Sequence, residues 1–219
     1  MLKSRKLVPE RLSVTLRCRE LGCRRGSLTL FRNVEFQIGA GEVLQVVGGN
    51  GSGKSTLLRT LVGLRPPDAG TVLWRDSDVH CEPARFHSEL LFIGHASGVK
   101  ENLNAVENVI QSELLVGPSA EVRALEALAH AGLSAHAYSL TRTLSQGQRR
   151  RVALARLYLA QRKQVWILDE PFVGLDSHAV KTLCDGMQAH RASGGIIVYT
   201  THQDSMSWGG RKLQLGKSV

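Results

Sequence analysis

The chain has 219 residues, of which 42% are hydrophobic and 21% are charged, and its formal net charge is +9. This composition is that of an ordinary globular domain, and it excludes a disordered chain, a collagen and a coiled-coil rod. The length suits one domain with its own core and is too short for two enzymatic domains. Apolar runs stop after four or five residues, whereas a membrane-spanning helix needs ~20, so we expect no membrane span.

The positive charge is concentrated at the N-terminus, where residues 1–32 hold nine basic and two acidic residues. Such a segment is either a solvated surface or attracted to anionic lipid headgroups or nucleic acid. It has no apolar stretch typical of a secretory signal, and Glu10 argues against a mitochondrial transit peptide. The four cysteines form no Cys-x-x-Cys pair, so we expect free thiols in a reducing compartment.

The first half of the chain predicts three strands and one helix. Residues 12–16 and 28–38 alternate roughly between apolar and polar, as half-buried strands do, and 42–47 predicts a third strand. Apolar residues at helical spacing then predict a helix over 55–64, which we expect the Pro and Gly residues of 66–70 to end.

The second half predicts a helical part followed by two more strands. Three segments have helical periodicity and suggest a helical subdomain: 105–115, 119–131 and 149–159. Residues 165–168 and 196–200 are continuous apolar runs, typical of strands buried on both faces of a parallel sheet, with a helix expected over 177–191 between them. The predicted fold class is therefore α/β with a helical insert.

A glycine-rich segment follows the predicted strand 42–47 and matches the phosphate-binding pattern G-x-x-x-x-G-K-[ST]. Its backbone N–H groups can surround a triphosphate, Lys54 would reach the β- and γ-phosphates, and Ser55 would bind Mg²⁺. The alternative is a glycine turn that binds nothing. The expected nucleotide-binding residues of this segment are Gly48, Asn50, Gly51, Ser52, Gly53, Lys54, Ser55 and Thr56.

Two carboxylates, Asp169 and Glu170, come directly after the predicted buried strand 165–168. Unpaired acids at a buried strand end are costly. A Mg²⁺ ion would explain Asp169, and an attacking water would use Glu170 as its base, which are two roles that nucleoside triphosphate hydrolysis requires. Taken alone, the pair could also be a surface cap.

The segment Leu144–Gln148, followed by three arginines, resembles the signature motif of ABC-type ATPases. Ser145 can cap a helix there and, with the Gly147 N–H group and the helix dipole, form a second anion site. Ser145, Gly147 and Gln148 are therefore further expected nucleotide-binding residues. The resemblance implies a P-loop NTPase fold of the ABC type, with a mixed-sheet core and a helical subdomain. It also implies a head-to-tail homodimer in which the signature of one subunit closes over the ATP of the other.

The resemblance extends over residues 12–203 of a single domain, 1–219. It implies a catalytic core of 12–86 and 161–205 and a helical, signature-bearing part of 87–160. Gly174–Asp176 looks like the D-loop of the family, and His202 looks like the switch histidine that contacts the γ-phosphate. Two positions depart from the usual pattern. His95 stands where most relatives have Gln, and Arg25 stands where an aromatic residue usually stacks on adenine.

Four fragments resemble, more narrowly, the ATPase subunit of the cytochrome c maturation system, often called the haem exporter ATPase: Trp166–Phe172, Leu154–Leu157, Gly194–Ile197 and Thr200–Gln203. This implies an ATP-hydrolysing transporter subunit that uses ATP and Mg²⁺ on the cytoplasmic face of the inner membrane. Its implied partners are integral membrane subunits, held near His95 to Glu107, and haem-handling maturation proteins.

Three alternatives remain beside this interpretation. The chain could be the ATPase of another small ABC transporter. A nucleic-acid-associated ATPase would use the basic N-terminus, but such relatives carry long coiled coils or two ATPase units, so we expect no nucleic acid partner. A binding module without hydrolysis is disfavoured because no catalytic position is missing.

Overall fold

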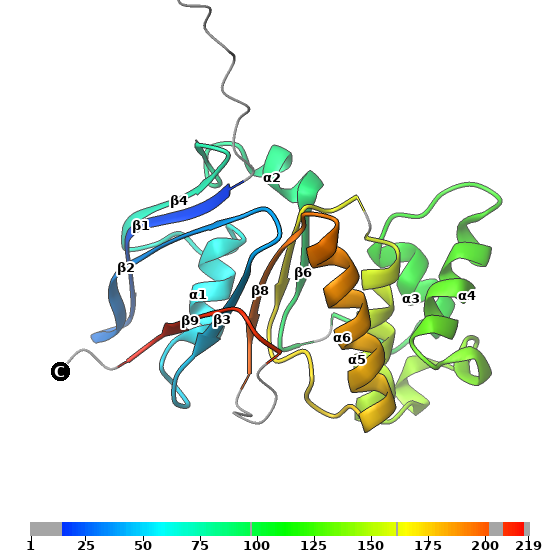
Figure 1. Ribbon diagram of the computed structural model, residues 1–219. Helices are drawn as coiled ribbons and strands as arrows, with labels where there is room; N and C mark the ends of the chain where they lie inside the picture. The colour runs from blue at the N-terminus through cyan, green and yellow to red at the C-terminus, as the bar shows by residue number, and fades with distance from the viewer. Residues whose placement is uncertain (1–14, 97, 161, 202–207, 217–219) are drawn as a thin grey trace, which may run out of the picture.

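The computed structural model describes residues 15–96, 98–160, 162–201 and 208–216, which form two β-sheets and a set of helices (Figure 1). The strands are β1 (Thr15–Arg25), β2 (Leu28–Gly39), β3 (Val43–Val47), β4 (Ala69–Trp74), β5 (Ser77–Asp78), β6 (Leu90–Ile93), β7 (Val165–Leu168), β8 (Ile196–Thr200) and β9 (Arg211–Gln214). The helices are α1 (Lys54–Leu61), α2 (Pro83–Glu89), α3 (Ala105–Ser112), α4 (Ala120–His130), α5 (Gln146–Ala155) and α6 (Ser177–Ala192). Short 3-10 turns are η1 (Ser134–His136), η2 (Thr141–Thr143) and η3 (Arg156–Tyr158).

One sheet is antiparallel, with the strand order β2-β1-β4-β5. In the second half of β2 the side chains alternate between buried and exposed, as expected for a strand with one face on a core. The buried side chains of β2 include Phe31, Val34, Phe36 and Ile38.

The other sheet is parallel, with the order β6-β7-β8-β3-β9. Every residue of β7 and β8 is buried, which agrees with their continuous apolar sequences. Because the strands are parallel, their carboxyl ends meet at one edge, and polar segments that follow different strands lie there together. The glycine-rich loop follows β3, Asp169 follows β7, and Thr200 ends β8 between them.

Three groups of buried side chains hold these layers together. The first fills the space between the two sheets, where α1 contributes Leu57, Leu58 and Leu61. The second lies on the opposite face of the parallel sheet and is covered by α5 and α6, and the third packs α3, α4 and α5 together. Figure 1 shows the resulting order, with α1 between the sheets and the α3–α4 pair at the far end.

Helix α1 ends at Leu61, three residues earlier than the sequence pattern predicted. Gly63 has a φ of +76° and donates its N–H to the Thr60 carbonyl, while the Leu64 N–H bonds the Arg59 carbonyl. This pair of bonds is a Schellman motif, which ends a helix at a glycine. The expected terminators at 66–70 are therefore not what ends it, and 69–70 instead open strand β4.

Other predicted bounds also shift. The helices expected over 105–115 and 119–131 are Ala105–Ser112 and Ala120–His130. The helix expected over 149–159 begins earlier, at Gln146, and gives way to a 3-10 turn after Ala155. Of the strand expected over 12–16, residues 12–14 lie outside the described residues, and β1 continues to Arg25.

Five elements were not predicted: β4, β5, α2, β6 and β9. Strand β6 pairs with β7 in the parallel sheet, so the range 87–160 expected for the helical part contains a strand of the core sheet. The division of the chain into a core of 12–86 and 161–205 and a helical part of 87–160 otherwise stays a prediction. Within the described ranges, no helix combines the length and the apolar character needed to cross a bilayer.

Candidate functional site

The glycine-rich loop connects β3 to α1, as the pattern predicted. Gly48 has no room for a side chain, because an added Cβ would lie 2.5 Å from the Leu215 carbonyl oxygen and 2.7 Å from the Ser52 Oγ. Gly53 caps α1 with a φ of +94°, a left-handed conformation that favours glycine. Because these positions carry no side chain, the backbone of the loop can approach a ligand at the N-terminus of α1. A helix N-terminus favours an anion as that ligand.

Lys54, the first residue of α1, points into this loop. Its side chain is buried, and its Nζ donates hydrogen bonds to the carbonyls of Gly48 at 2.7 Å and Gly49 at 3.1 Å. Burial lowers the pKa of Lys54, while the negative charges of Glu170 and Asp169 oppose that shift. The ammonium group thus lies in a site whose two carboxylates favour its charged form.

Asp169 and Glu170 follow β7 and are held by Thr200, the last residue of β8. Asp169 is buried, and its Oδ1 accepts a hydrogen bond from the Thr200 Oγ1 at 2.8 Å. The same hydroxyl oxygen accepts from the Glu170 N–H at 2.8 Å. Glu170 has a φ of +51°, a strained conformation of the kind found at functional sites. One buried hydroxyl therefore fixes both acidic residues.

Glu170, His95 and the glycine-rich loop line one cavity of about 370 Å³. The His95 Nδ1 lies 3.8 Å from the Glu170 Oε2. The residues around this cavity are Arg25, Leu30, Asn50, Gly51, Ser52, Gly53, Lys54, Ser55, Thr56, His95 and Glu170. The structure thus brings together most of the residues that the sequence analysis selected for nucleotide binding, including both unusual positions.

A nucleotide with Mg²⁺ fits the residues present. The Ser52 Oγ is buried and has no hydrogen-bond partner in the described part of the chain, so a ligand in the cavity could satisfy it. The Ser55 hydroxyl and the Asp169 carboxylate offer the hard oxygen donors that Mg²⁺ prefers. No cluster of three or more His, Cys, Asp or Glu residues suited to a metal occurs among the described residues.

The signature residues lie at the start of α5 and do not line this cavity. The Ser145 Oγ accepts from the Gln148 N–H at 3.2 Å, and the Gln148 Oε1 accepts from the Ser145 N–H at 2.8 Å, forming a capping box. A Cβ at Gly147 would lie 2.5 Å from the Gly174 carbonyl oxygen. Within one chain, the signature therefore packs closely against the loop that contains Gly174. It does not line the cavity of the phosphate-binding loop.

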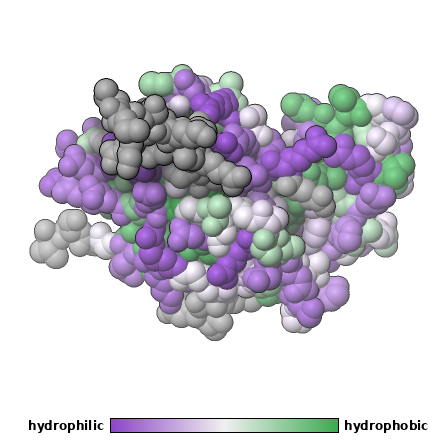
Figure 2. Space-filling model, turned by 45° about the horizontal axis from the view of Figure 1, so that its top comes forward, coloured by the Kyte–Doolittle hydropathy of each residue, from purple (hydrophilic) through white to green (hydrophobic). Residues whose placement is uncertain are grey.

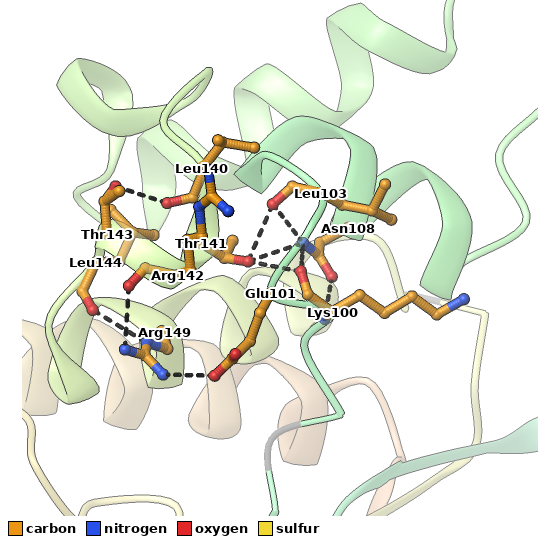
Figure 3. A network of polar contacts seen from close by, with 10 residues as sticks. All are labelled: Lys100, Glu101, Leu103, Asn108, Leu140, Thr141, Arg142, Thr143, Leu144 and Arg149. Carbon is orange, nitrogen blue, oxygen red and sulfur yellow. Dashed lines mark hydrogen bonds and ion pairs between the residues drawn. The ribbon is translucent and has the colours of Figure 1, made fainter.

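Residues 140–144, the lead-in of the signature, are joined by a network of polar contacts to residues 100–103, which precede α3 (Figure 3). The buried Thr141 hydroxyl donates to the Lys100 carbonyl at 2.6 Å, and the Asn108 amide bonds the same carbonyl at 3.0 Å. Arg149 pairs with Glu101 at 3.1 Å and donates to the Leu144 carbonyl at 3.0 Å. The start of α5 and the chain that follows His95 are therefore fixed to each other.

Sequence reasoning missed three residues of this region. Leu30 gives the cavity an apolar wall beside Arg25, and Thr200 holds both acids. Arg150, on α5, donates to the carbonyls of Asp169 and Glu170. The sequence does carry a signal for Thr200, which is a hydroxyl residue at the end of an apolar run. It carries none for Arg150, because Arg149 and Arg151 on either side are also basic. His202 lies outside the described residues, so its predicted role stays a prediction.

We expect Thr200→Val to lower the free energy of unfolding by ~1–3 kcal/mol, because it removes a hydrogen-bond partner of a buried carboxylate at nearly constant volume. ATP hydrolysis should fall as well, since Glu170 loses its backbone anchor. Urea unfolding and steady-state turnover would measure the two effects. Thr200→Ser keeps the hydroxyl and is the matched control. Equal stability of the Val variant and wild type would contradict the role assigned to this hydroxyl.

Comparison with known proteins agrees with this geometry. A model of the ABC transporter family matches residues 31–173. "Cytochrome c biogenesis ATP-binding export protein CcmA" of Escherichia coli (strain K12) is 46% identical over 188 residues, which cover 86% of this chain and 89% of that protein. The protein of the same name from Shigella flexneri gives the same identity and coverage. Among solved structures, the "Dimeric structure of a post-hydrolysis state of the ATP-binding cassette MJ0796 bound to ADP and Pi" is 26% identical, has a TM-score of 0.82 and covers 91% of this chain and 94% of that one.

Proposed function

Because this chain belongs to the ABC transporter family of ATP-binding proteins, we propose that it hydrolyses ATP to drive a membrane complex of cytochrome c maturation. One observation carries the catalytic part of this proposal. The phosphate-binding loop with Lys54 and the carboxylate of Glu170 line the same cavity. A base therefore faces the place where the terminal phosphate of a nucleotide would lie.

The residues around the cavity have separate tasks in this reaction. Backbone N–H groups of the loop and the Lys54 ammonium bind the phosphates of ATP. Glu170 orients the attacking water and takes its proton, and ADP leaves as phosphate forms. Ser55 and Asp169 would hold Mg²⁺, which when bound supplies positive charge against the phosphate oxygens. His202 is proposed to contact the γ-phosphate.

Arg25 and Leu30, which also line the cavity, would receive the base of the nucleotide. A guanidinium can stack on a purine, and Leu30 adds an apolar contact beside it. His95, which lies against Glu170, stands where a glutamine is usual in the family. We propose that His95 takes over the link between the helical part and the water-orienting carboxylate.

We propose that two copies bind ATP between them. The signature residues Ser145, Gly147 and Gln148 lie apart from the phosphate-binding loop of their own chain. A second copy would bring its own signature, with the N-terminus of its α5, to the bound nucleotide. The solved relative MJ0796 is described as dimeric, which supports this arrangement.

The partners in the membrane are proposed to be integral subunits that dock near His95 to Glu107. Figure 2 shows hydrophobic side chains gathered on the end of the molecule that α3 and α4 form, and the exposed residues of this part include Leu114, Val116 and Val122. An apolar area of this kind suits a protein contact. We propose that the chain works on the cytoplasmic face of the inner membrane, next to haem-handling maturation proteins, and its similarity to a cytochrome c biogenesis ATP-binding protein supports this.

A genetic experiment tests the whole proposal. In a strain without this gene, we expect covalently bound haem to disappear from the membrane proteins, because c-type cytochromes no longer mature. Wild type should restore the haem stain and Lys54→Ala should not, whereas Lys181→Ala, a change on the exposed face of α6, serves as the control that restores it. Haem staining that persists in the deletion strain would assign the ATPase to another small transporter, and the membrane protein that co-purifies with it would identify which.

A further inference from the structure

A buried arginine on α5 joins the signature helix to both catalytic loops of the same chain. Arg150 is 7% exposed. Its Nη1 donates to the Gly94 carbonyl at 2.8 Å, and its Nη2 donates to the carbonyls of Asp169 at 2.6 Å and Glu170 at 3.1 Å. One guanidinium thus holds the chain that follows β6 and the chain that follows β7.

These carbonyls belong to the backbone that carries the catalytic side chains. Gly94 immediately precedes His95, and Glu170 itself is in a left-handed conformation. Such a conformation persists only where surrounding contacts enforce it. Thr200 holds the N–H side of Glu170 and Arg150 holds its carbonyl side, so the direction of the Glu170 side chain depends on both.

Two neighbouring residues of α5 contact other segments. Arg149, the preceding residue, pairs with Glu101 and bonds the lead-in of the signature (Figure 3). Gly147, one turn earlier, lies against the Gly174 carbonyl. The helix therefore carries the signature at its start and, within the next turn, a rigid connection to His95 and Glu170. Any shift of its N-terminus moves the guanidinium.

We propose that Arg150 is a positioning residue that couples the signature end of α5 to Glu170 and His95 of the same chain. Docking of a second copy on the signature would then adjust the water-orienting carboxylate, which links the two ATP sites of a dimer. A planar guanidinium with fixed donors suits three backbone acceptors better than a lysine ammonium does. The inference rests on the proposed dimeric ATPase.

The test compares Arg150→Gln and Arg150→Lys with wild type in steady-state ATP hydrolysis. For Arg150→Gln we expect kcat to fall on the order of 10²-fold, the loss typical of a displaced catalytic group, with the KM for ATP unchanged because Arg150 does not line the nucleotide cavity. The Hill coefficient for ATP should fall toward one. Arg150→Lys should recover part of kcat, since one ammonium can still bond one or two of the carbonyls.

Arg85→Gln is the control. Arg85 is an exposed arginine of α2 whose Nη1 lies 3.6 Å from the Glu82 Oε2, so its loss should leave kcat and the Hill coefficient unchanged. Thermal unfolding separates positioning from folding, and Arg150→Lys carries the test if Arg150→Gln fails to fold. Wild-type kcat and cooperativity in the Arg150 variants would overturn the inference, as would a rise in KM that accounts for the whole loss. A wild-type protein that does not hydrolyse ATP would instead overturn the proposed function.

Discussion

Replacing Glu170 with glutamine is expected to lower kcat for ATP hydrolysis by about 10²–10⁴-fold, the usual contribution of a general base. Glutamine keeps the size of the side chain but cannot accept the proton of the attacking water. The phosphate-binding loop is untouched, so the variant should still bind ATP. Turnover measured by phosphate release checks the first effect, and equilibrium binding of ATP checks the second.

The same variant should also keep the ATP-bound dimer together. In the proposed cycle ATP closes the dimer and hydrolysis opens it, so a variant that binds but does not hydrolyse should elute from a sizing column at twice the monomer mass of 23.9 kDa when ATP is present. Glu35→Gln, an exposed acid on β2, is the control and should behave as wild type. A Glu170→Gln protein that stays monomeric in saturating ATP would argue against the closing mechanism, and unchanged turnover would show that another group activates the water.

For Lys54→Ala we expect the affinity for ATP to fall by roughly 10- to 100-fold. A hydrogen bond to a charged group is worth about 1.5–3 kcal/mol, and about 1.4 kcal/mol corresponds to a factor of ten in Kd. The substitution also removes the two bonds from Nζ to the carbonyls of Gly48 and Gly49, so the loop loses part of its own support. Hydrolysis should drop with binding. Titration calorimetry with ATP measures the change in Kd.

Lys181→Ala is a suitable comparison, because Lys181 is an exposed lysine of α6 whose ion pair with Asp185 contributes little. Its ATP affinity should match wild type. If Lys54→Ala bound ATP as tightly as wild type does, the ammonium would have no role in phosphate binding, and the assignment of this cavity to a nucleotide would have to be reconsidered.

The bounds of a strand could be predicted from the sequence where the strand is a continuous apolar run. Strands β7 and β8 were predicted at their observed limits, because they are short, mostly apolar runs and every residue in them is buried. Strand β9 was missed because all its side chains but Leu213 are polar and most are exposed, and its pairing with β3 is what makes it a strand. Strand β6 was missed because it follows α2 without a glycine or proline to separate them.

The state of the cysteines could also be predicted only in part from the sequence. All four cysteines are free thiols, as expected. Burial in the core raises the pKa of Cys18 well above its usual range, so this thiol is packed as a small apolar side chain rather than poised to react. Composition predicted free thiols, whereas the degree of burial came only from the packing of β1 between its two neighbours.

The sequence by itself determined the fold class, the phosphate-binding loop and the identity of the two acids, because these depend on local patterns: glycine spacing, a helix start and a buried strand that ends in carboxylates. Only the tertiary structure decided which of these segments meet. The parallel order of β6, β7, β8 and β3 brings Glu170 and His95 to Lys54. The signature residues of the same chain do not line the cavity that contains Lys54. It also decided the role of Arg150, since a guanidinium can position two loops only where folding has placed three carbonyl groups around it.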